Sequence, residues 1–344
     1  GKNCLCVHLT YVPYIHAAGE FKTKPTQHSV KQLQEAGIQP DILVLRTEQA
    51  LQKDILAKVA QFCNVAPDAV IQSIDMPTIY EIPLLLRDQK MDEAVLRKVG
   101  IEPGPRPEMK AWCAFVEKLK SAHEEVSIAL VGKYVELQDA YKSIDESLLQ
   151  SCTYNDKKLC LTSIQSEHIT EENVAELLSG FDGVLIAPGF GQRGVEGKLV
   201  ALKYTREKGI PTLGICLGMQ CMAIECARNG LGLTDANTAE IAPASKNRVI
   251  DIMEQQKTVT DLGGSMRLGA YTCRLKPGSK ISEAYGKTMI SERHRHRYEF
   301  NGEYREAFEN NGFHCVGENP ETNLVEALEL EGHPWYIGVQ YHPE

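Results

Sequence analysis

The stretch Pro211-Thr-Leu-Gly-Ile-Cys-Leu-Gly-Met-Gln220 decides the fold and points to one residue, Cys216. An apolar run ends at this cysteine, which has a glycine two positions away on each side. The spacing Gly-x-Cys-x-Gly is typical of a nucleophile elbow, a sharp turn from a strand into a helix that presents the central side chain. Glycines suit such a turn, because it leaves little room for side chains and can need unusual backbone angles. The pattern predicts a reactive cysteine at the end of a strand.

The position of Cys216 also carries a prediction about its ionisation. A sulfur at the N-terminus of a helix lies close to free N–H groups and to the positive end of the helix dipole, which favour the thiolate. The alternative is a buried and inert cysteine, since free cysteine is among the most buried residue types. The flanking glycines, and a histidine near the end of the chain, favour the reactive interpretation.

Strands and helices alternate around the elbow, from Val126 to the helical segment Leu217–Arg228. This alternation predicts a doubly wound sheet, whose ligands bind at the carboxyl ends of the strands. After residue 240 the pattern becomes strand-rich, including an expected strand from Glu292 to Asn301. The predicted fold class of this part is therefore α/β, with a mixed sheet and a strand-rich C-terminal portion.

The first 100 residues show a second α/β series, with expected strands at Cys4–Leu9, Asp41–Arg46 and Val70–Ile74 and an expected helix at Val30–Ala36. That series predicts a parallel α/β layer. Residues 101–107 contain three prolines and one glycine, which is typical of a linker. The expected domains are residues 1–100, a linker with its helix at 101–124, and residues 125–344.

Composition limits the possible classes of function. The 344 residues are 43% hydrophobic with a net charge of −9, which indicates a soluble globular protein and argues against general nucleic-acid binding. The eleven cysteines are scattered, and no apolar run approaches about eighteen residues, so we expect a reduced cytoplasmic protein without disulfides or membrane spans. The cysteine spacings do not match a metal site, and no metal is expected.

A base for Cys216 is predicted at the end of the chain, where the sequence runs Tyr341-His-Pro-Glu344. In an extended chain His342 and Glu344 point the same way, so the carboxylate can orient the imidazole while its other nitrogen faces the sulfur. The alternative is a surface histidine. Upstream, Gly189-Phe-Gly-Gln-Arg-Gly194 has the form Gly-x-Gly-x-x-Gly. We interpret it as a loop whose N–H groups stabilise an oxyanion, the alternative being a dinucleotide site.

Two basic segments predict anion binding. Lys22, Lys24, Thr26 and Gln27 form a dense set of donors in an expected loop before a helix, which predicts a polyphosphate site, and Lys58 could join them; a solvated basic loop is the alternative. In Glu292–Glu299, strand alternation would place Arg293, Arg295 and Arg297 on one face and two histidines on the other. One of these arginines could bind a substrate carboxylate.

Together these residues resemble a known family. Gly-Ile-Cys-Leu-Gly-Met-Gln with a terminal Tyr-His-Pro-Glu is similar to class I glutamine amidotransferases. The lysine loop, Val131-Gly-Lys-Tyr134, Gly264-Ser-Met-Arg-Leu-Gly269 and the arginine run are similar to the CTP synthases among them. The implied fold is the C-terminal half of a P-loop-like synthetase domain joined to a class I glutaminase.

For the glutaminase, the resemblance implies that Cys216 attacks glutamine, that His342 transfers the proton and that Glu344 orients it. Backbone N–H groups of Gly189 and Leu217 would hold the oxyanion. Gln220, Glu240 and Arg297 would bind the glutamine head group, Arg297 at its carboxylate. Arg193 and Glu196 would lie in a lid loop through which GTP activates hydrolysis.

For the synthetase, the resemblance implies ATP- and Mg²⁺-dependent amination of UTP, with Lys22, Lys24, Gln27 and Lys58 holding the triphosphate of UTP or of the inhibitor CTP. It also implies a homotetramer, with filaments as a further assembly. The sequence has no Gly-x-x-x-x-Gly-Lys-[Ser/Thr] motif, so we expect a chain truncated before its ATP site and after Glu344, competent at most for glutamine hydrolysis. The alternatives are the glutaminase of another amidotransferase, such as GMP synthetase, and a non-catalytic nucleotide-binding fragment.

Overall fold

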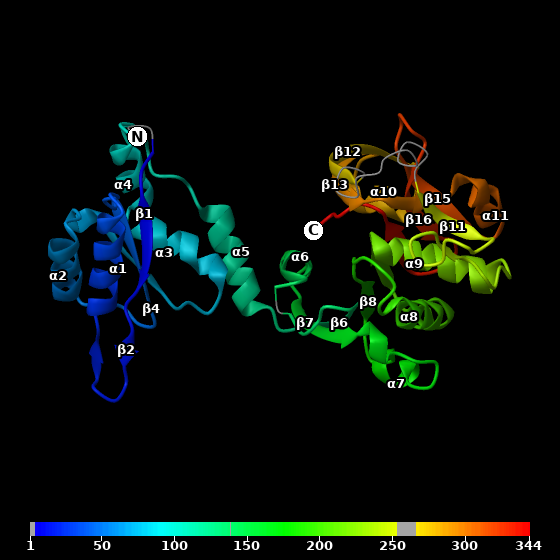
Figure 1. Ribbon diagram of the computed structural model, residues 1–344, viewed down its shortest axis with the longest axis horizontal. Helices are drawn as coiled ribbons and strands as arrows, with labels where there is room; N and C mark the ends of the chain where they lie inside the picture. The colour runs from blue at the N-terminus through cyan, green and yellow to red at the C-terminus, as the bar shows by residue number, and fades with distance from the viewer. Residues whose placement is uncertain (1–3, 138, 253–265) are drawn as a thin grey trace. The chain divides into compact units, whose positions relative to one another are not determined.

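The computed structural model describes residues 4–137, 139–252 and 266–344. It divides into two compact units, Gly1–Ser121 and Ala122–Glu344, each with its own sheets and its own buried core (Figure 1). All eleven cysteines are free thiols. Among the described residues, no helix combines the length and the apolar character needed to cross a membrane.

The N-terminal unit is built on a three-stranded parallel sheet in the order β1-β4-β5. The central strand β4 (Ile42–Thr47) is buried along its first four residues, as is typical of a parallel strand covered on both faces. Its neighbours are β1 (Val7–Tyr11) and β5 (Val70–Ile74). The core forms where apolar side chains of the helices, such as Val30 and Val59, pack on this sheet.

A hairpin and five helices complete this unit: β2 (Tyr14–Ile15), β3 (Glu20–Phe21), α1 (Lys24–Glu35), α2 (Lys53–Cys63), α3 (Ile82–Asp88), α4 (Met91–Lys98) and α5 (Lys110–Ser121). Residues 101–109 form neither helix nor strand, as their prolines predict.

Helix α1 differs from the prediction, because it begins at Lys24 and not near Val30. Pro25 lies in its first turn, where the missing N–H costs nothing since that donor has no partner within the helix. Lys24 and Gln27 therefore belong to a helix N-terminus and not to a loop. Thr26 was expected to be a free donor, but it is buried, and its hydroxyl lies 3.1 Å from both Thr10 Oγ1 and Tyr11 O.

The second unit is built on a nine-stranded mixed sheet in the order β13-β12-β15-β16-β17-β9-β8-β6-β7. The strands from β17 to β7 are parallel neighbours, and those from β13 to β17 are antiparallel. This mixed α/β sheet agrees with the predicted fold class. The strands are β6 (Glu125–Gly132), β7 (Lys158–Gln165), β8 (Gly183–Ile186), β9 (Thr212–Ile215), β12 (Arg267–Leu275), β13 (Met289–His296), β15 (Phe313–Glu318), β16 (Val325–Leu330) and β17 (Tyr336–Val339).

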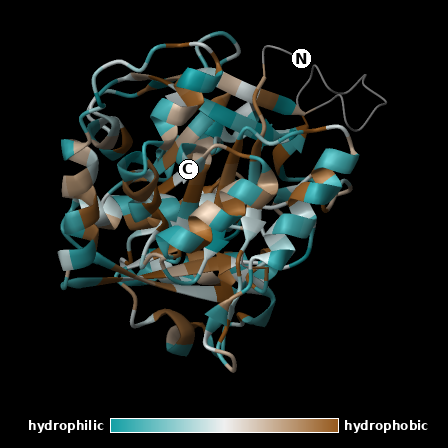
Figure 2. Ribbon diagram, turned by 90° about the vertical axis from the view of Figure 1, so that its left-hand side faces the viewer, coloured by the Kyte–Doolittle hydropathy of each residue, from teal (hydrophilic) through white to brown (hydrophobic). Residues whose placement is uncertain are grey.

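Helices cover both faces of this sheet, so the unit has two hydrophobic cores, one on each face. Successive residues of one strand point into different cores. Val184 and Ile186 of β8 belong to one core, whereas Leu185 belongs to the other. The first core includes side chains of α7 (Val174–Leu178), α8 (Val195–Lys208), α9 (Leu217–Glu225) and α11 (Arg305–Asn310), and the second those of α6 (Lys142–Tyr154) and α10 (Lys280–Tyr285). Figure 2, coloured by hydropathy, shows helices that carry both brown and teal residues.

The strand-rich portion differs from the prediction in three ways. Helices α10 and α11 were not expected. The single strand expected from Glu292 to Asn301 is two strands, β13 and β14 (Tyr298–Phe300), which separate at Arg297. β14 joins a second small sheet with β10 (Asn237–Thr238) and β11 (Arg248–Ile252). Of the motif at 264–269, residues 264 and 265 lie outside the described residues.

Candidate active site

Cys216 lies at a strained turn between β9 and α9. Its backbone has φ +53° and ψ −104°, and residues other than glycine rarely adopt a positive φ. The turn is also tightly packed. A Cβ on Gly214 would lie 2.7 Å from the carbonyl carbon of Gly218, and one on Gly218 would lie 2.3 Å from Ile186 O. Both glycines are therefore required by close packing of α9 onto the neighbouring strands.

The thiol of Cys216 is buried and is held in place by hydrogen bonds. It donates to Arg295 O at 3.9 Å, and Gln340 Nε2 donates to Sγ at 3.6 Å. Burial raises the pKa of this thiol to about 12, although the Leu217 N–H and the charge of Lys198 act in the opposite direction. The prediction of a thiolate stabilised by the helix N-terminus is therefore wrong for this state, because desolvation outweighs the helix.

His342 and Glu344 follow the last strand, which lies beside the strand that leads into the elbow. β17 runs parallel to β9 with Val339 opposite Ile215, and the Cys216 N–H donates to Val339 O at 2.7 Å. Beyond the strand, the His342 N–H donates to Arg293 O at 2.8 Å. His342 Nδ1 lies 2.8 Å from Glu344 Oε1, so the carboxylate fixes the imidazole through one ring nitrogen. The other nitrogen remains for proton transfer.

A cavity of about 380 Å³ opens beside Cys216. Four further residues singled out from the sequence, Gly189, Gln220, Glu240 and Arg297, line it together with the cysteine. Its volume is at the lower end of small-molecule sites, which run from about 300 to 1,000 Å³. Its remaining lining residues are Phe190, Met266, His296 and Tyr298.

Two polar groups of the cavity are already held by the protein. Gln220 Nε2 donates to Tyr298 O at 2.8 Å and to Gln340 Oε1 at 3.1 Å. Glu240 Oε1 accepts the Gly191 N–H at 2.8 Å. The amide and the carboxylate therefore have fixed positions on the wall of the cavity, as is needed to orient a small ligand.

The three arginines of β13 and its end have separate surroundings. Arg293 and Arg295 are exposed while His294 and His296 are buried, which confirms the predicted alternation for these four residues. The prediction is wrong for Arg297, because β13 ends at His296 and Arg297 lines the cavity together with that histidine. Arg293 lies 3.7 Å from Glu344 Oε1, and the Arg295 guanidinium lies 6.0 Å from the centre of the Phe190 ring. Of the three, only Arg297 lines the cavity.

Arg193 and Glu196, expected in a lid loop, are held in different places. Arg193 pairs with Glu167 at 2.7 Å and donates to Lys133 O at 3.0 Å. Glu196 lies in the first turn of α8 and pairs with Arg228 at 2.9 Å. Arg193 thus contacts Lys133, which lies against the Gly189 loop, whereas Glu196 pairs with Arg228.

The residues expected to hold a triphosphate all lie in the N-terminal unit. Lys22 pairs with Glu20, and the hydrogen bond from Lys22 lowers the pKa of Glu20, with Lys58 acting in the same direction. Lys58 is therefore within electrostatic reach of the Lys22 region. Gln27 Nε2 donates to Thr23 Oγ1 at 3.1 Å, at the start of the helix that Lys24 begins.

Sequence reasoning missed several residues around Cys216. Gln340 contacts both Gln220 and Cys216, and strand alternation from His342 could have indicated it. Phe190 and His296 are the sequence neighbours of Gly189 and Arg297, two of the predicted site residues. Lys133 and Lys198 are buried under the Gly189 loop, and their burial could not be read from the sequence.

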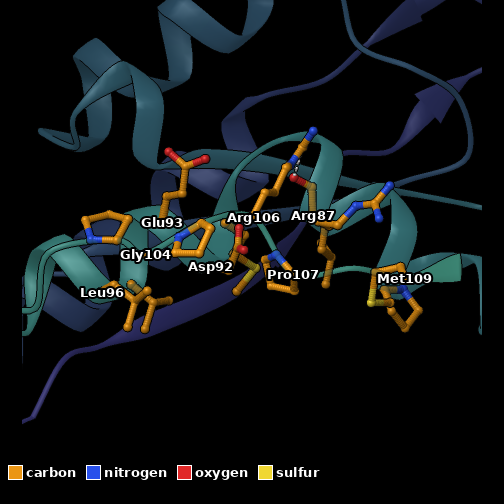
Figure 3. A pocket seen from close by; sticks show the side chains of 14 residues that line it. Arg87, Asp92, Glu93, Leu96, Gly104, Arg106, Pro107 and Met109 are labelled. Atoms are coloured by element: carbon orange, nitrogen blue, oxygen red, sulfur yellow. Dashed lines mark hydrogen bonds between the residues drawn. The ribbon is translucent and has the colours of Figure 1, made fainter. Parts of the chain in front are cut away.

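A larger cavity, of about 600 Å³, lies in the N-terminal unit between α3, α4 and the proline-rich segment (Figure 3). Arg106 crosses it and donates to Arg87 O at 2.7 Å. Most of its other lining side chains are apolar, and none of the residues predicted to bind substrate or to act in catalysis is among them. Its size does not make it an active site, because it lacks a nucleophile with a paired base.

Comparisons with known proteins match the two units of the chain to two different families. Residues 1–101 match the family described as CTP synthase N-terminus, and residues 136–344 match the family described as glutamine amidotransferase class-I. Both match the ranges in which the sequence placed the lysine segment and the elbow.

Individual relatives extend the match to the whole chain. CTP synthase of Porphyromonas gingivalis is 70% identical and that of Bacteroides fragilis 61% identical, over all of this chain and 64% of each relative. The chain therefore spans slightly less than two thirds of the length of these relatives. Among solved structures, the Trypanosoma brucei CTPS glutaminase domain with bound acivicin is 33% identical with a TM-score of 0.59, and the match covers 63% of this chain and 86% of that domain.

Proposed function

Because this chain belongs to the CTP synthase family of class I glutamine amidotransferases, we propose that its unit Ala122–Glu344 hydrolyses glutamine to glutamate and ammonia at Cys216. The observation that supports this most directly is the convergence of Cys216, Gln220, Glu240 and Arg297 on one cavity. The hydrogen bond between His342 and Glu344 orients the imidazole, which would act as the base that a buried thiol needs.

In the proposed reaction, Cys216 Sγ attacks the side-chain amide carbon of glutamine while its proton passes to His342. The thiol begins protonated, because burial raises its pKa to about 12, so attack and proton transfer must be coupled. The Leu217 N–H, which already contacts the sulfur, and the Gly189 N–H would hold the oxyanion. His342 then returns the proton to the leaving ammonia, and water cleaves the thioester to release glutamate and restore the thiol.

The cavity supports recognition of the amino-acid head group. Arg297 would bind the α-carboxylate through its planar donor pair, and Glu240 would bind the α-ammonium. Gln220 completes this wall, since Tyr298 O and Gln340 fix its amide group. The T. brucei domain holds acivicin, a small molecule, which agrees with a cavity of this size.

The test is release of glutamate from glutamine by the full chain, with GTP present and absent. We expect activity in the parent and its loss in Cys216→Ala. His342→Ala should lose at least about a hundredfold, as is typical for removing a general base. A Cys216→Ala variant as active as the parent would refute the assignment of the nucleophile.

For the whole protein we propose the reaction of the family, ATP-dependent amination of UTP to CTP with the ammonia released at Cys216. The N-terminal match and the cationic start of α1 support this proposal, with Lys22, Lys24, Gln27 and Lys58 at the triphosphate. The sequence contains no P-loop motif, so the role proposed for the N-terminal unit is limited to holding that triphosphate. GTP activation through Arg193, a homotetramer and a cytoplasmic location are proposed from the family alone.

Nucleotide binding by the N-terminal unit can be measured separately from hydrolysis. We expect Lys22→Ala combined with Lys24→Ala to weaken UTP binding by at least about tenfold, since each lysine adds a charge-assisted contact to the phosphates. Lys110→Ala is a matched control, because Lys110 is an exposed lysine of the same unit. Equal UTP affinity in the parent and the double variant, measured by calorimetry, would refute this site.

A further inference from the structure

Two buried lysines lie beneath the loop that carries Gly189, and the proposed reaction does not yet use them. Lys198 is 0% exposed and Lys133 is 3% exposed. Burying an ammonium group is costly unless it is paired or fully hydrogen-bonded. Within the part of the chain that the structure describes, neither ammonium group forms an ion pair or hydrogen bond with a carboxylate. Their contacts are with backbone carbonyls instead.

Both ammonium groups contact the same short loop, residues 187–191. Lys198 Nζ donates to Ala187 O at 2.5 Å, at the end of β8. Lys133 Nζ donates to Phe190 O and lies 3.5 Å from Gly191 O. The loop is thus held by an ammonium group near each of its ends.

The loop has little freedom between these two points. A Cβ on Gly189 would lie 3.0 Å from Lys133 Cε and 3.5 Å from Leu217 Cδ2, so the Gly189 backbone rests on both side chains. The peptide that joins Phe190 to Gly191 is fixed from both sides. Its carbonyl accepts from Lys133, while its N–H donates to Glu240 at 2.8 Å. Lys133 therefore also holds in place a carboxylate of the cavity wall.

We propose that Lys133 and Lys198 are positioning residues for glutamine hydrolysis, which fix the loop 187–191 so that Gly189 faces the oxyanion beside Cys216. This inference rests on the proposed glutaminase function. The two positive charges behind the loop also favour the negative charge that develops on the substrate oxygen and on the sulfur.

The electrostatics of the two lysines agree with this role. Burial lowers the pKa of Lys198 to about 8, and electrostatic interaction with the Cys221 and Cys216 sulfur atoms acts against that shift, which places Lys198 within reach of the nucleophile. Burial and then the charge of Arg193 lower the pKa of Lys133, whereas Glu240 raises it. Burial therefore lowers the pKa of both lysines, and the charged groups around the loop add to or oppose that shift.

The test compares Lys198→Met and Lys133→Met with Lys203→Met in the full chain. Lys203 is the matched control, because it lies on the same helix as Lys198 but is partly exposed and pairs with Glu171 at 3.2 Å. We expect each buried variant to lose about tenfold to a hundredfold in kcat, which is less than the roughly hundredfold to thousandfold cost of losing an oxyanion donor itself. KM for glutamine should stay within about threefold in Lys198→Met, and Lys203→Met should match the parent.

A second measurement separates positioning from loss of packing. The rate of Cys216 alkylation by iodoacetamide, followed by mass spectrometry, should fall in Lys198→Met because the thiolate loses a nearby positive charge. General loosening of the structure would instead expose the buried thiol and raise this rate. In Lys133→Met the rate should fall less than in Lys198→Met, because Lys198 is among the groups that act most strongly on the Cys216 pKa.

The outcomes distinguish this inference from the proposed function. A parent chain without glutaminase activity refutes the function, and a lower alkylation rate in Lys198→Met would still support the electrostatic part of the inference. An active parent with both variants within twofold of its kcat refutes the positioning role alone. If Lys198→Met does not fold, Lys133→Met decides by the same criterion.

Discussion

At the scale of the residue, Cys216 combines a strained backbone with a thiol that the free protein keeps protonated. The strain is supported by two glycines that fit α9 against β9 and β8, and the protonation follows from burial. A nucleophile of this kind depends on its surroundings for activation, so its neighbours matter as much as its own position. Single substitutions and reagents aimed at the elbow can therefore test both properties.

Gly218→Ala should displace the start of α9 and abolish glutaminase activity. Its Cβ would lie 2.3 Å from Ile186 O, so strand or helix must move, at about 1–3 kcal/mol in the free energy of unfolding. Gly180→Ala is the control, because a Cβ there meets nothing within 4 Å. Urea unfolding with an activity assay measures both; equal behaviour of the two variants would contradict the packing argument.

The reactivity of Cys216 in the absence of substrate should be low and strongly dependent on pH. Because burial raises its pKa to about 12, the thiolate fraction rises about tenfold per pH unit across the range in which the fold persists. Alkylation of the Cys216 peptide by iodoacetamide, measured between pH 7 and 9 by mass spectrometry, tests this expectation. A rate that levels off near pH 7 would show a thiolate already present.

At the scale of the elements, four strands contribute to a buried cluster of titratable side chains, one of which lines the cavity. Arg267 of β12 lies 2.7 Å from Glu326 of β16 and 3.9 Å from Glu299 of β14. His294 Nδ1 of β13 lies 2.9 Å from His296 Nε2, and His294 Nε2 lies 3.4 Å from Glu326. Since His296 also lines the cavity, this cluster connects the antiparallel half of the sheet to the cavity beside Cys216.

The cluster should make stability depend on pH on both sides of neutrality. Burial raises the pKa of Glu299 from 4.5 to about 8 and that of Glu326 to about 7, so the folded state holds more protons than the unfolded state above pH 4.5. The stability from these carboxyl protons is therefore lost as the pH rises towards 8. Burial lowers the pKa of His294 to about 2 and that of His296 to about 3, so stability is also lost as the pH falls below 6.5.

Glu299→Gln tests the alkaline side. Each proton that the folded state binds and the unfolded state does not changes the free energy of unfolding by about 1.4 kcal/mol per pH unit. Between pH 6.5 and 8 the parent should lose stability faster than the variant, whose amide cannot ionise. Denaturant unfolding at several pH values measures the difference, with Glu303→Gln, at an exposed position, as control. Parallel curves for the parent and Glu299→Gln would contradict the raised pKa.

At the scale of the whole molecule, the chain consists of two units, each with its own sheet and core. The elbow, the loop 187–191, Glu240, Arg297 and the terminal histidine all belong to the second unit. The lysines of the proposed triphosphate site belong to the first. The proposed ammonia production and the proposed nucleotide binding therefore belong to different compact units.

A chain of residues 122–344 alone should fold and hydrolyse glutamine. Its nine-stranded sheet and both of its cores lie within these residues, so no core side chain is lost. We expect its kcat/KM without GTP to be within about threefold of that of the full chain. The measurement is glutamate release together with thermal unfolding, and an aggregated or inactive product would show that the first unit is needed for folding or for the site.

The sequence by itself determined the local and repeating features. The glycines around Cys216 predicted the elbow, since backbone sterics act between near neighbours, and alternating apolar runs predicted the α/β sheet. The alternation of Arg293, His294, Arg295 and His296 followed from strand geometry alone. Candidate head-group residues could be named only through the family resemblance.

Only the tertiary structure decided what depends on burial and on contacts between distant segments. Helix α1 begins at Lys24 with Pro25 in its first turn, and the burial of Thr26 against Thr10 and Tyr11 depends on contacts between distant segments. The thiol of Cys216 is protonated, since desolvation by the assembled sheet and helices outweighs the local helix N-terminus. Lys133 and Lys198 come from different elements to one loop, because desolvation and long-range packing are properties of the folded chain and not of its neighbouring residues.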